Sequence, residues 1–193
     1  MRISDDRYSR DRLRIDIALN FIRHEARTHT IRQWTGLTDD RIRKLYRSYL
    51  SAGGHRVIRH RGKSPRQAGY FLRTARLRQE AAALAGLCGL VGLVGTRGAA
   101  GAPVPAPAPG IARAASLLQA YEAYGAIVGQ PLIAFEHAVL LVTALGRGDE
   151  LSLARCADCG VLLVADPLAL RAPHCTLCTG EALRPASHRH MDH

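Results

Sequence analysis

Four cysteines near the C-terminal end of the chain have the type and spacing that metal binding requires. Cys156 and Cys159 form one Cys-x-x-Cys pair, and Cys175 and Cys178 form a second pair. Each such turn directs two thiolates at one centre, so two turns supply the four soft ligands of a tetrahedral Zn²⁺ site. Gly160 follows the first pair and suits the tight turn with positive φ that these loops need. The spacing predicts one structural zinc ion per chain.

Other chemistry of these thiols stays open. Disulfides need an oxidising compartment, and the sequence shows no secretory signal. A redox Cys-x-x-Cys pair normally opens a helix in a thioredoxin-like unit, and one pair would suffice. An iron–sulfur cluster also takes four thiolates, but two even pairs around a short hairpin are more typical of a zinc ribbon. We expect His174 to be solvated or to lie outside the four ligands, and the ion to stabilise the fold without catalysing a reaction.

Basic residues are concentrated in the N-terminal part. Residues 1–80 hold 20 basic and 8 acidic side chains, whereas residues 81–193 hold 7 and 8, and the formal net charge is +11. A one-sided basic block is expected to bind a polyanion, most often nucleic acid. An apolar content of 47% excludes a mainly disordered chain. The longest apolar run, residues 81–95, is too short to span a bilayer, which favours a buried helix and a cytoplasmic location.

Helices must position this basic block. Leu13, Ile17 and Phe21 recur every four residues and predict an amphipathic helix over about residues 10–28. The face opposite these apolar residues carries Arg12, Arg23 and Arg27. The first helix is therefore expected to bury one side and to expose a basic side.

The next two predicted helices form a helix-turn-helix-like pattern. A short helix at residues 30–35 is followed by a turn at Gly36 and by a third helix that runs from an N-cap at Thr38 to about residue 50. The inner face of the third helix holds Ile42, Leu45, Tyr46 and Tyr49, and its outer face holds Arg41, Arg43, Lys44 and Arg47. A recognition helix uses such an outer face to contact phosphates and bases.

The match to a helix-turn-helix has two departures. Arg32 stands where a small residue is usual, and Thr35 stands where an apolar residue is usual. A plain amphipathic helix pair with a solvated basic face explains the same residues. The segment that follows, residues 51–63, is a predicted loop or β-arm that carries Arg56, Arg59, Arg61 and Lys63. A solvated loop is the simpler interpretation, but the density of charge beside a basic helix favours phosphate contact.

The rest of the chain is predicted to be mainly helical up to the cysteines. Ser64 and Pro65 predict the N-cap and first position of a helix that continues into the apolar run. Further helices are expected at residues 112–128 and 131–145, the latter ended by Gly146. Strands are expected at residues 151–154 and 161–165.

The predicted fold class is mainly α, with a helix-turn-helix-like N-terminal part and a small C-terminal zinc-ribbon module. The expected divisions are a basic, DNA-contacting region at 1–63, a helical core or partner-binding region at 64–148 with a flexible Pro/Ala insertion at 96–110, the zinc module at 149–180 and a disordered tail at 181–193. Cys88 is expected to be a small buried apolar residue.

Two regions of the chain, in this order, resemble the FlhC family, a subunit of the bacterial flagellar transcriptional activator. The first region is GLTDDRIRKLYRSYLSAGG, followed by a basic segment and SPRQAGYFL. The second is the pair of Cys-x-x-Cys turns that follows YEAYGAIVG and PLIAFEHAVLLV. The resemblance covers about residues 10–180. The Pro/Ala stretch and a C-terminal tail that is poor in lysine depart from the family pattern.

The resemblance implies a largely helical protein with one structural zinc ion, assembled with FlhD into a heterohexamer. In that family the complex binds and bends promoter DNA of flagellar operons and recruits RNA polymerase. Carried onto this sequence, the zinc ligands are Cys156, Cys159, Cys175 and Cys178. The implied DNA contacts are the basic residues between Arg41 and Lys63.

Two functions from other classes compete with a DNA-binding activator. An RNA- or ribosome-associated zinc-ribbon protein would share the basic half, but it would need exposed aromatic side chains on which bases stack. Tyr46, Tyr49 and Tyr70 have the spacing of core residues instead. A zinc deaminase needs a His-x-Glu sequence before its cysteine pair, and none occurs in the sequence. We therefore expect a protein that is not an enzyme.

Overall fold

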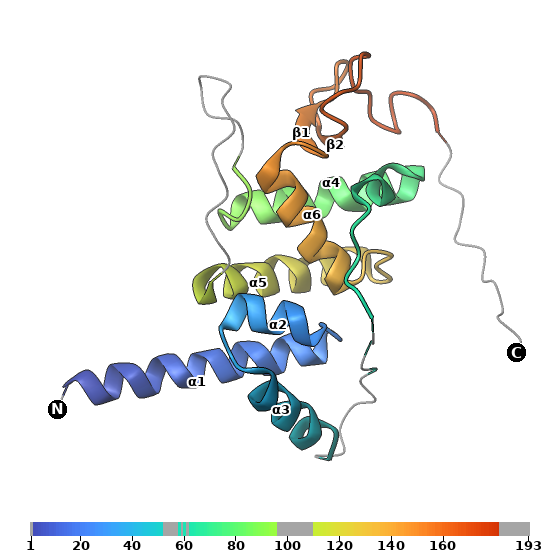
Figure 1. Ribbon diagram of the computed structural model, residues 1–193. Coiled ribbons are helices and arrows are strands. Elements are labelled where there is room, and N and C mark those ends of the chain that lie inside the picture. Colours follow the sequence, from blue (N-terminus) through green and yellow to red (C-terminus); the bar gives the residue numbers. More distant parts are fainter. Residues whose placement is uncertain (1, 52–57, 59, 61, 96–109, 182–193) are drawn as a thin grey trace, which may run out of the picture.

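The structure is a computed structural model that describes residues 2–51, 58, 60, 62–95 and 110–181. Helices dominate this part of the chain, which confirms the mainly α fold class. The elements in chain order are α1 (Arg2–Arg23), α2 (Thr28–Thr35), α3 (Asp39–Ser51), the 3₁₀ helix η1 (Ala68–Leu72), α4 (Ala75–Leu90), α5 (Ile111–Val128), α6 (Phe135–Arg147), β1 (Ser152–Arg155) and β2 (Leu162–Ala165). Figure 1 shows α1, α2 and α3 at one end of the molecule and the strands at the other, with α4, α5 and α6 between them. Among the described helices, none has the length and apolar character needed to cross a bilayer.

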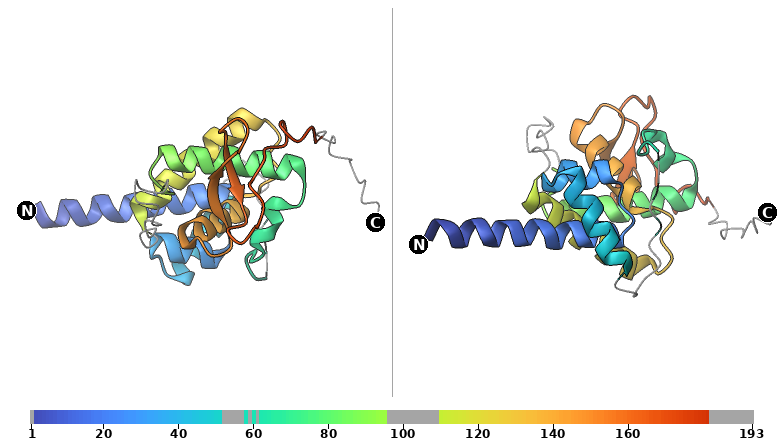
Figure 2. Two further views of the ribbon diagram at one scale, coloured as in Figure 1. Left: turned by 90° about the horizontal axis from the view of Figure 1, so that it is seen from above. Right: turned by 60° about the horizontal axis from the view of Figure 1, so that its bottom comes forward.

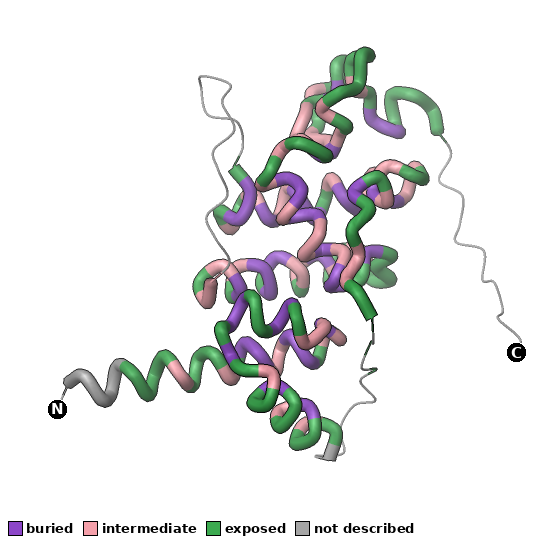
Figure 3. Tube along the Cα trace, viewed as in Figure 1, coloured by how far each residue is buried: buried purple, intermediate pink, exposed green. Residues whose placement is uncertain are grey.

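The boundaries predicted for the first helix, residues 10–28, are wrong. α1 runs over Arg2–Arg23 and ends where Glu25 adopts a left-handed φ of 60°. Its N-terminal half extends beyond the other helices (Figure 2), and most of residues 7–14 are exposed (Figure 3). Leu13 was assigned to the core face, but 46% of its surface is exposed because no described element covers its side of α1.

The predicted pair of helices and the turn between them are confirmed in α2 and α3. Gly36 ends α2 with a left-handed φ of 71°. The Thr38 side chain then accepts a hydrogen bond from the Arg41 N–H (3.4 Å), as an N-cap does. Asp39 and Asp40 occupy the first turn of α3, where the helix dipole favours acidic side chains.

The two departures from a helix-turn-helix pattern both have a local physical solution. Thr35 is buried, yet its hydroxyl donates a hydrogen bond to the Ile31 carbonyl (2.7 Å). Burial therefore leaves no unsatisfied polar group. The Arg32 side chain is exposed, and its guanidinium lies 3.6 Å from the Asp39 carboxylate across the turn. A small residue is not required at position 32 because that side chain lies outside the helix packing.

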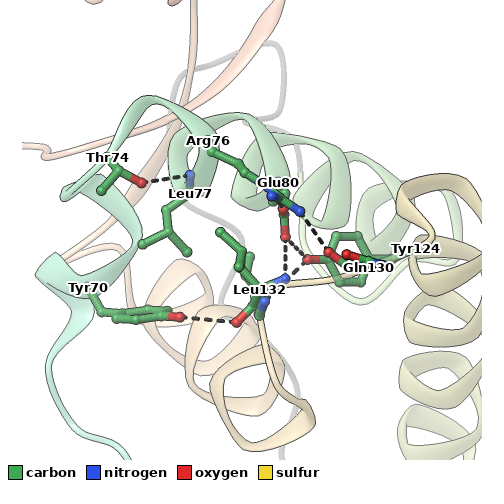
Figure 4. Close-up of polar contacts among 9 residues, drawn as sticks. Tyr70, Thr74, Arg76, Leu77, Glu80, Tyr124, Gln130 and Leu132 are labelled. Carbon is green, nitrogen blue, oxygen red and sulfur yellow. Dashed lines mark hydrogen bonds and ion pairs between the residues drawn. The ribbon is translucent and has the colours of Figure 1, made fainter. Parts of the chain in front are cut away.

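The prediction that a helix begins at Ser64 is wrong. Only the short η1 forms before α4, and α4 begins at Ala75. Thr74 is its N-cap, since the Thr74 hydroxyl oxygen accepts a hydrogen bond from the Leu77 N–H at 3.2 Å (Figure 4). The extended backbone of Thr74 separates the two helices, and η1 buries Phe71 in the core.

The two helices before the strands differ from the predictions mainly at α6. α5 matches the predicted range, and Gly129 follows it with a φ of 74°. α6 begins four residues later than Pro131, and Gly148, with a φ of 75°, ends it in place of Gly146. The connector between α5 and α6 is irregular, and its Leu132 N–H bonds to the Glu80 carboxylate (2.8 Å).

A buried carboxylate joins α4, α5 and this connector (Figure 4). Glu80 is 5% exposed and accepts a hydrogen bond from Arg76 Nε (2.8 Å) as well as from the Leu132 N–H. The Tyr124 hydroxyl donates to the same carboxylate. Burial and this contact raise the pKa of Tyr124 above its ordinary value. Because every partner of Glu80 is in place, the buried charge is compensated.

One apolar core runs through the helices and reaches the strands. Phe21 of α1 packs edge-on against Phe135 of α6, with ring centroids 4.8 Å apart. Cys88 is buried in this core, as predicted, and burial raises the pKa of its thiol to about 12. At the other end, Leu151 and Val164 bring the strands into the same core. The strands are antiparallel and pair Ser152 with Ala165 through Arg155 with Leu162, at almost the predicted positions.

Candidate metal centre and basic helix face

The first cysteine pair lies in the turn between β1 and β2. Cys156 directly follows β1, and its N–H bonds to the Val161 carbonyl (2.9 Å) at the end of the ladder. The Gly160 N–H returns to the Cys156 carbonyl (3.0 Å), and Gly160 has the predicted positive φ of 71°. The strands therefore fix the direction in which both thiols of this turn point.

The second pair repeats this geometry in a loop without strands. The Thr179 N–H bonds to the Cys175 carbonyl (3.0 Å), and Gly180 has a left-handed φ of 67°. Sequence reasoning missed this second glycine, although the order Cys-x-x-Cys-x-Gly contains the signal. The Ala157 N–H donates to the Pro173 carbonyl (3.0 Å) and so ties the second loop to the first.

All four predicted ligand atoms are brought together. The sulfurs of Cys156, Cys159, Cys175 and Cys178 lie within 4.8 Å of one another, and the Cys159 and Cys175 sulfurs are 3.7 Å apart. A tetrahedral ion with Zn–S bonds of about 2.3 Å would place its sulfurs about 3.8 Å apart. The four cysteines therefore form a cluster that can hold one metal ion.

The electrostatics of the cluster favour a cation. Backbone N–H groups, those of Cys159 and Cys175 foremost, lower the pKa of Cys156 to about 6. The Cys175 N–H, for example, is 3.2 Å from the Cys156 sulfur. By contrast, contact with the Cys175 sulfur raises the pKa of Cys178. One thiolate forms readily, and crowding by the other sulfurs opposes further ionisation. A divalent ion at the centre would remove that repulsion.

An exposed Asp–His pair flanks the cluster. His174 Nδ1 lies 2.7 Å from the Asp158 carboxylate, and this contact raises the pKa of His174. The two residues and Cys156 also lie close enough to form a second possible ligand set. Because the Asp158 contact favours the protonated imidazole, which cannot bind a metal, the geometry favours the four cysteines.

Polar contacts attach the cysteine module to α4. Gln79 donates a hydrogen bond to the Thr176 hydroxyl (2.6 Å), and Arg78 forms an ion pair with Glu181. Thr176 is buried beneath the second cysteine turn. Sequence reasoning missed Arg78 and Gln79, because their partners lie about a hundred positions away and no local pattern relates them. They fix the module on the helical body.

The predicted basic face of α3 is exposed. Ile42 and Tyr46 are buried, while Arg41, Arg43, Lys44 and Arg47 all face solvent. Two of these cations form ion pairs within the protein. Arg41 forms an ion pair with Asp11 of α1 (2.9 Å), and Arg43 forms one with Asp40 (3.0 Å). Within the described part of the chain, Lys44 and Arg47 form no ion pair and lie on the outermost side of the helix.

The other predicted DNA contacts are only partly described. Arg56, Arg59 and Arg61 lie outside the described residues, as do the Pro/Ala insertion and the tail beyond residue 181. Lys63 is described and exposed. It borders a polar cavity of about 920 Å³ together with Gln33 of α2 and Arg147 of α6. The structure therefore places Lys63 beside α2 and α6.

The comparisons with known proteins give no match. No protein-family model matches the sequence, and no curated protein matches it at a significant level. The resemblance to FlhC stays a prediction from the quoted segments. The features of the molecule that bear on its function are the cysteine cluster and the basic face of α3.

Proposed function

We propose that the chain is a DNA-binding protein with one structural zinc ion. The observation that carries the proposal is the outward face of α3, which exposes Arg41, Arg43, Lys44 and Arg47 after a capped helix-turn-helix-like turn. Such a face suits the major groove and the phosphates on either side of it. The surplus of 20 basic over 8 acidic residues within positions 1–80 adds long-range attraction to a polyanion.

More particularly, we propose that the chain is the FlhC-like subunit of a transcriptional activator. Its partner would be an FlhD-like protein in a heterohexamer, and its target would be the promoter DNA of flagellar (class 2) operons, with RNA polymerase recruited there. The support is the resemblance of the α3 segment and of the helices before the cysteines, in the same order as in that family. Its site of action would be the cytoplasm.

In this mechanism no covalent step occurs. Lys44 and Arg47 displace counterions from DNA phosphates, while α2 fixes the orientation of α3 through the turn at Gly36. The four cysteines would hold zinc, which supplies rigid cross-links between the strands and the second loop. Base stacking by RNA needs exposed aromatic side chains. Tyr46 is buried, and the Tyr70 ring stacks on His137 with the ring centroids 4.2 Å apart. Tyr8 on α1 is 70% exposed, so the case for duplex DNA over RNA depends on the basic face of α3 and not on a lack of exposed aromatic rings.

The test is the salt dependence of duplex binding by the full-length chain. We expect Lys44→Gln/Arg47→Gln to reduce the slope of log affinity against log salt by about 2, because each lost phosphate contact removes about 0.9. Fluorescence anisotropy with a labelled mixed-sequence duplex measures that slope. Arg73→Gln/Arg171→Gln is the control, since it removes the same charge from exposed positions after η1 and on the loop between the cysteine pairs.

Three results would count against the proposal. The first is that the wild-type chain does not bind the duplex. The second is that the α3 variant and the control have equal salt slopes. The third is that the wild-type chain binds single-stranded RNA more tightly than the duplex. The last result would support the RNA-associated alternative and leave the metal site unaffected.

A further inference from the structure

The N-terminal half of α1 carries arginines on a face that is buried further along the same helix. With about 3.6 residues per turn, Arg7, Arg10 and Arg14 share the helix face of Ile17 and Phe21. Ile17 and Phe21 are buried in the core, whereas all three arginines are exposed. We call residues 2–16 the α1 arm and this side its inner face. The arm projects from the helical body (Figures 1 and 2).

The inner face is unusual because solvated arginines normally lie on the opposite side of an amphipathic helix. That opposite, outer face is present and carries Arg12 and Arg23, both exposed. The helix therefore carries cations on two faces. One is the outer face, which is turned to solvent, and the other is continuous with the side of the helix that is buried at Ile17 and Phe21. A solubilising role accounts for the outer face.

The inner face is joined to the basic face of α3. Asp11 lies between the arm's arginines and contacts Arg41 of α3 at 2.9 Å and Arg14 at 3.7 Å. The hydrogen bond from Arg41 lowers the pKa of the Asp11 carboxyl, so the link is ionised at neutral pH. Arg7, Arg10, Asp11 and Arg14 also line a hollow of about 540 Å³. The arm and α3 thus present one cationic surface across the Asp11–Arg41 contact.

We propose that the inner face of the α1 arm binds the phosphate backbone of the DNA duplex that α3 contacts. This inference rests on the proposed function and extends its interface to a second element. From Arg7 to Arg14 the helix rises about 10 Å, and phosphates of one strand recur about every 3.4 Å along the duplex axis. Three arginines over that length match the spacing of a phosphate run better than that of a single anion. Phosphate contacts of this kind fix orientation and raise affinity without reading sequence.

The test compares two double variants of the full-length chain that lose equal charge from opposite faces of α1. Arg7→Gln/Arg14→Gln changes the inner face, and Arg12→Gln/Arg23→Gln changes the outer face. We expect the inner variant to reduce the salt slope of duplex binding by about 2 and the outer variant by less than half as much. Far-UV circular dichroism of both variants establishes that α1 remains helical. The probe is the same labelled mixed-sequence duplex.

Equal slopes for the two variants would overturn the inference, because net charge alone would then explain the effect. A wild-type slope in the inner variant would also overturn the inference. If that variant also failed to co-purify with an acidic partner protein, the inner face would be assigned to that partner. In either case a reduced slope in Lys44→Gln/Arg47→Gln would leave the proposed function standing. Absence of wild-type binding to the duplex would instead refute the proposed function itself.

Discussion

The four cysteines of the cluster differ in how far they are buried. Cys156 and Cys175 are buried, while Cys159 and Cys178 are exposed. Both sulfurs of the buried pair accept backbone hydrogen bonds, Cys156 from the Cys175 N–H (3.2 Å) and Cys175 from the Cys178 N–H (3.3 Å). The exposed pair completes the cluster from the solvent side. Metal binding should therefore depend on all four positions, although only two are protected from solvent.

Replacing one exposed ligand tests this dependence. We expect Cys159→Ser to lower the metal content of the purified chain from about one ion to a small fraction, because a neutral hydroxyl replaces a thiolate. The measurement is elemental analysis by plasma mass spectrometry. Cys88→Ala is the matched control: it removes a buried cysteine outside the cluster, so metal content should persist while unfolding becomes about 1 kcal/mol easier. A full metal load in Cys159→Ser would contradict the four-cysteine site.

At the scale of elements, the Glu80 contacts decide how α4, α5 and the connector fit together. Glu80 binds partners from all three, because Arg76, Tyr124 and the Leu132 N–H all bond to its carboxylate. We expect Glu80→Ala to lower the free energy of unfolding by about 3–5 kcal/mol, since it leaves buried polar groups without partners. Tyr124→Phe, which removes one hydroxyl, should cost about 1 kcal/mol. Urea unfolding measures both.

A double variant separates the Glu80 contacts from simple packing loss. In Glu80→Ala/Tyr124→Phe, the Tyr124 hydroxyl is no longer left unsatisfied. We therefore expect the double change to destabilise the protein by less than the sum of the single changes, by about 1 kcal/mol. Strict additivity would mean that the hydroxyl and the carboxylate do not act as a pair.

For the whole molecule, the proposed sites lie at opposite ends. α3 and the α1 arm are at one end, and the cysteine module is at the other (Figure 1). An apolar groove of about 950 Å³ lies between α4 and the module and includes Leu87, Leu90 and Leu177. Leu90 and Leu177 are more than 80% exposed. Among the described residues, none covers this groove.

Assembly is tested by co-expression with an FlhD-like protein from the same genome. If the FlhC-like assignment is right, a complex of both chains should co-purify, with about one metal ion per copy of this chain. Size-exclusion chromatography with multi-angle light scattering measures its mass. A chain that purifies alone after co-expression would contradict the FlhC-like assignment, while leaving DNA binding and the metal site as separate questions.

Local signals in the sequence determined a large part of this protein. The spacing of the cysteines and Gly160 predicted the sulfur cluster, because a Cys-x-x-Cys turn is fixed by its own few residues. Gly36 and Thr38 predicted the turn between α2 and α3 for the same reason, since a left-handed glycine and an N-capping hydroxyl act on adjacent backbone. The apolar spacing in α3 likewise predicted which side is buried, since Ile42 and Tyr46 both lie in the core.

Tertiary structure decided what local signals left open. Ser64 and Pro65 form a good helix start, but Thr74 caps α4 instead, and residues before it pack as η1 and extended chain. Leu13 continues the apolar repeat of α1, yet it is exposed because no described element covers its side of the helix. Burial depends on which surfaces meet, and these are set by contacts between distant residues such as Glu80 and Leu132. The periodicity of a segment specifies a face, but only the assembled fold specifies whether anything covers it.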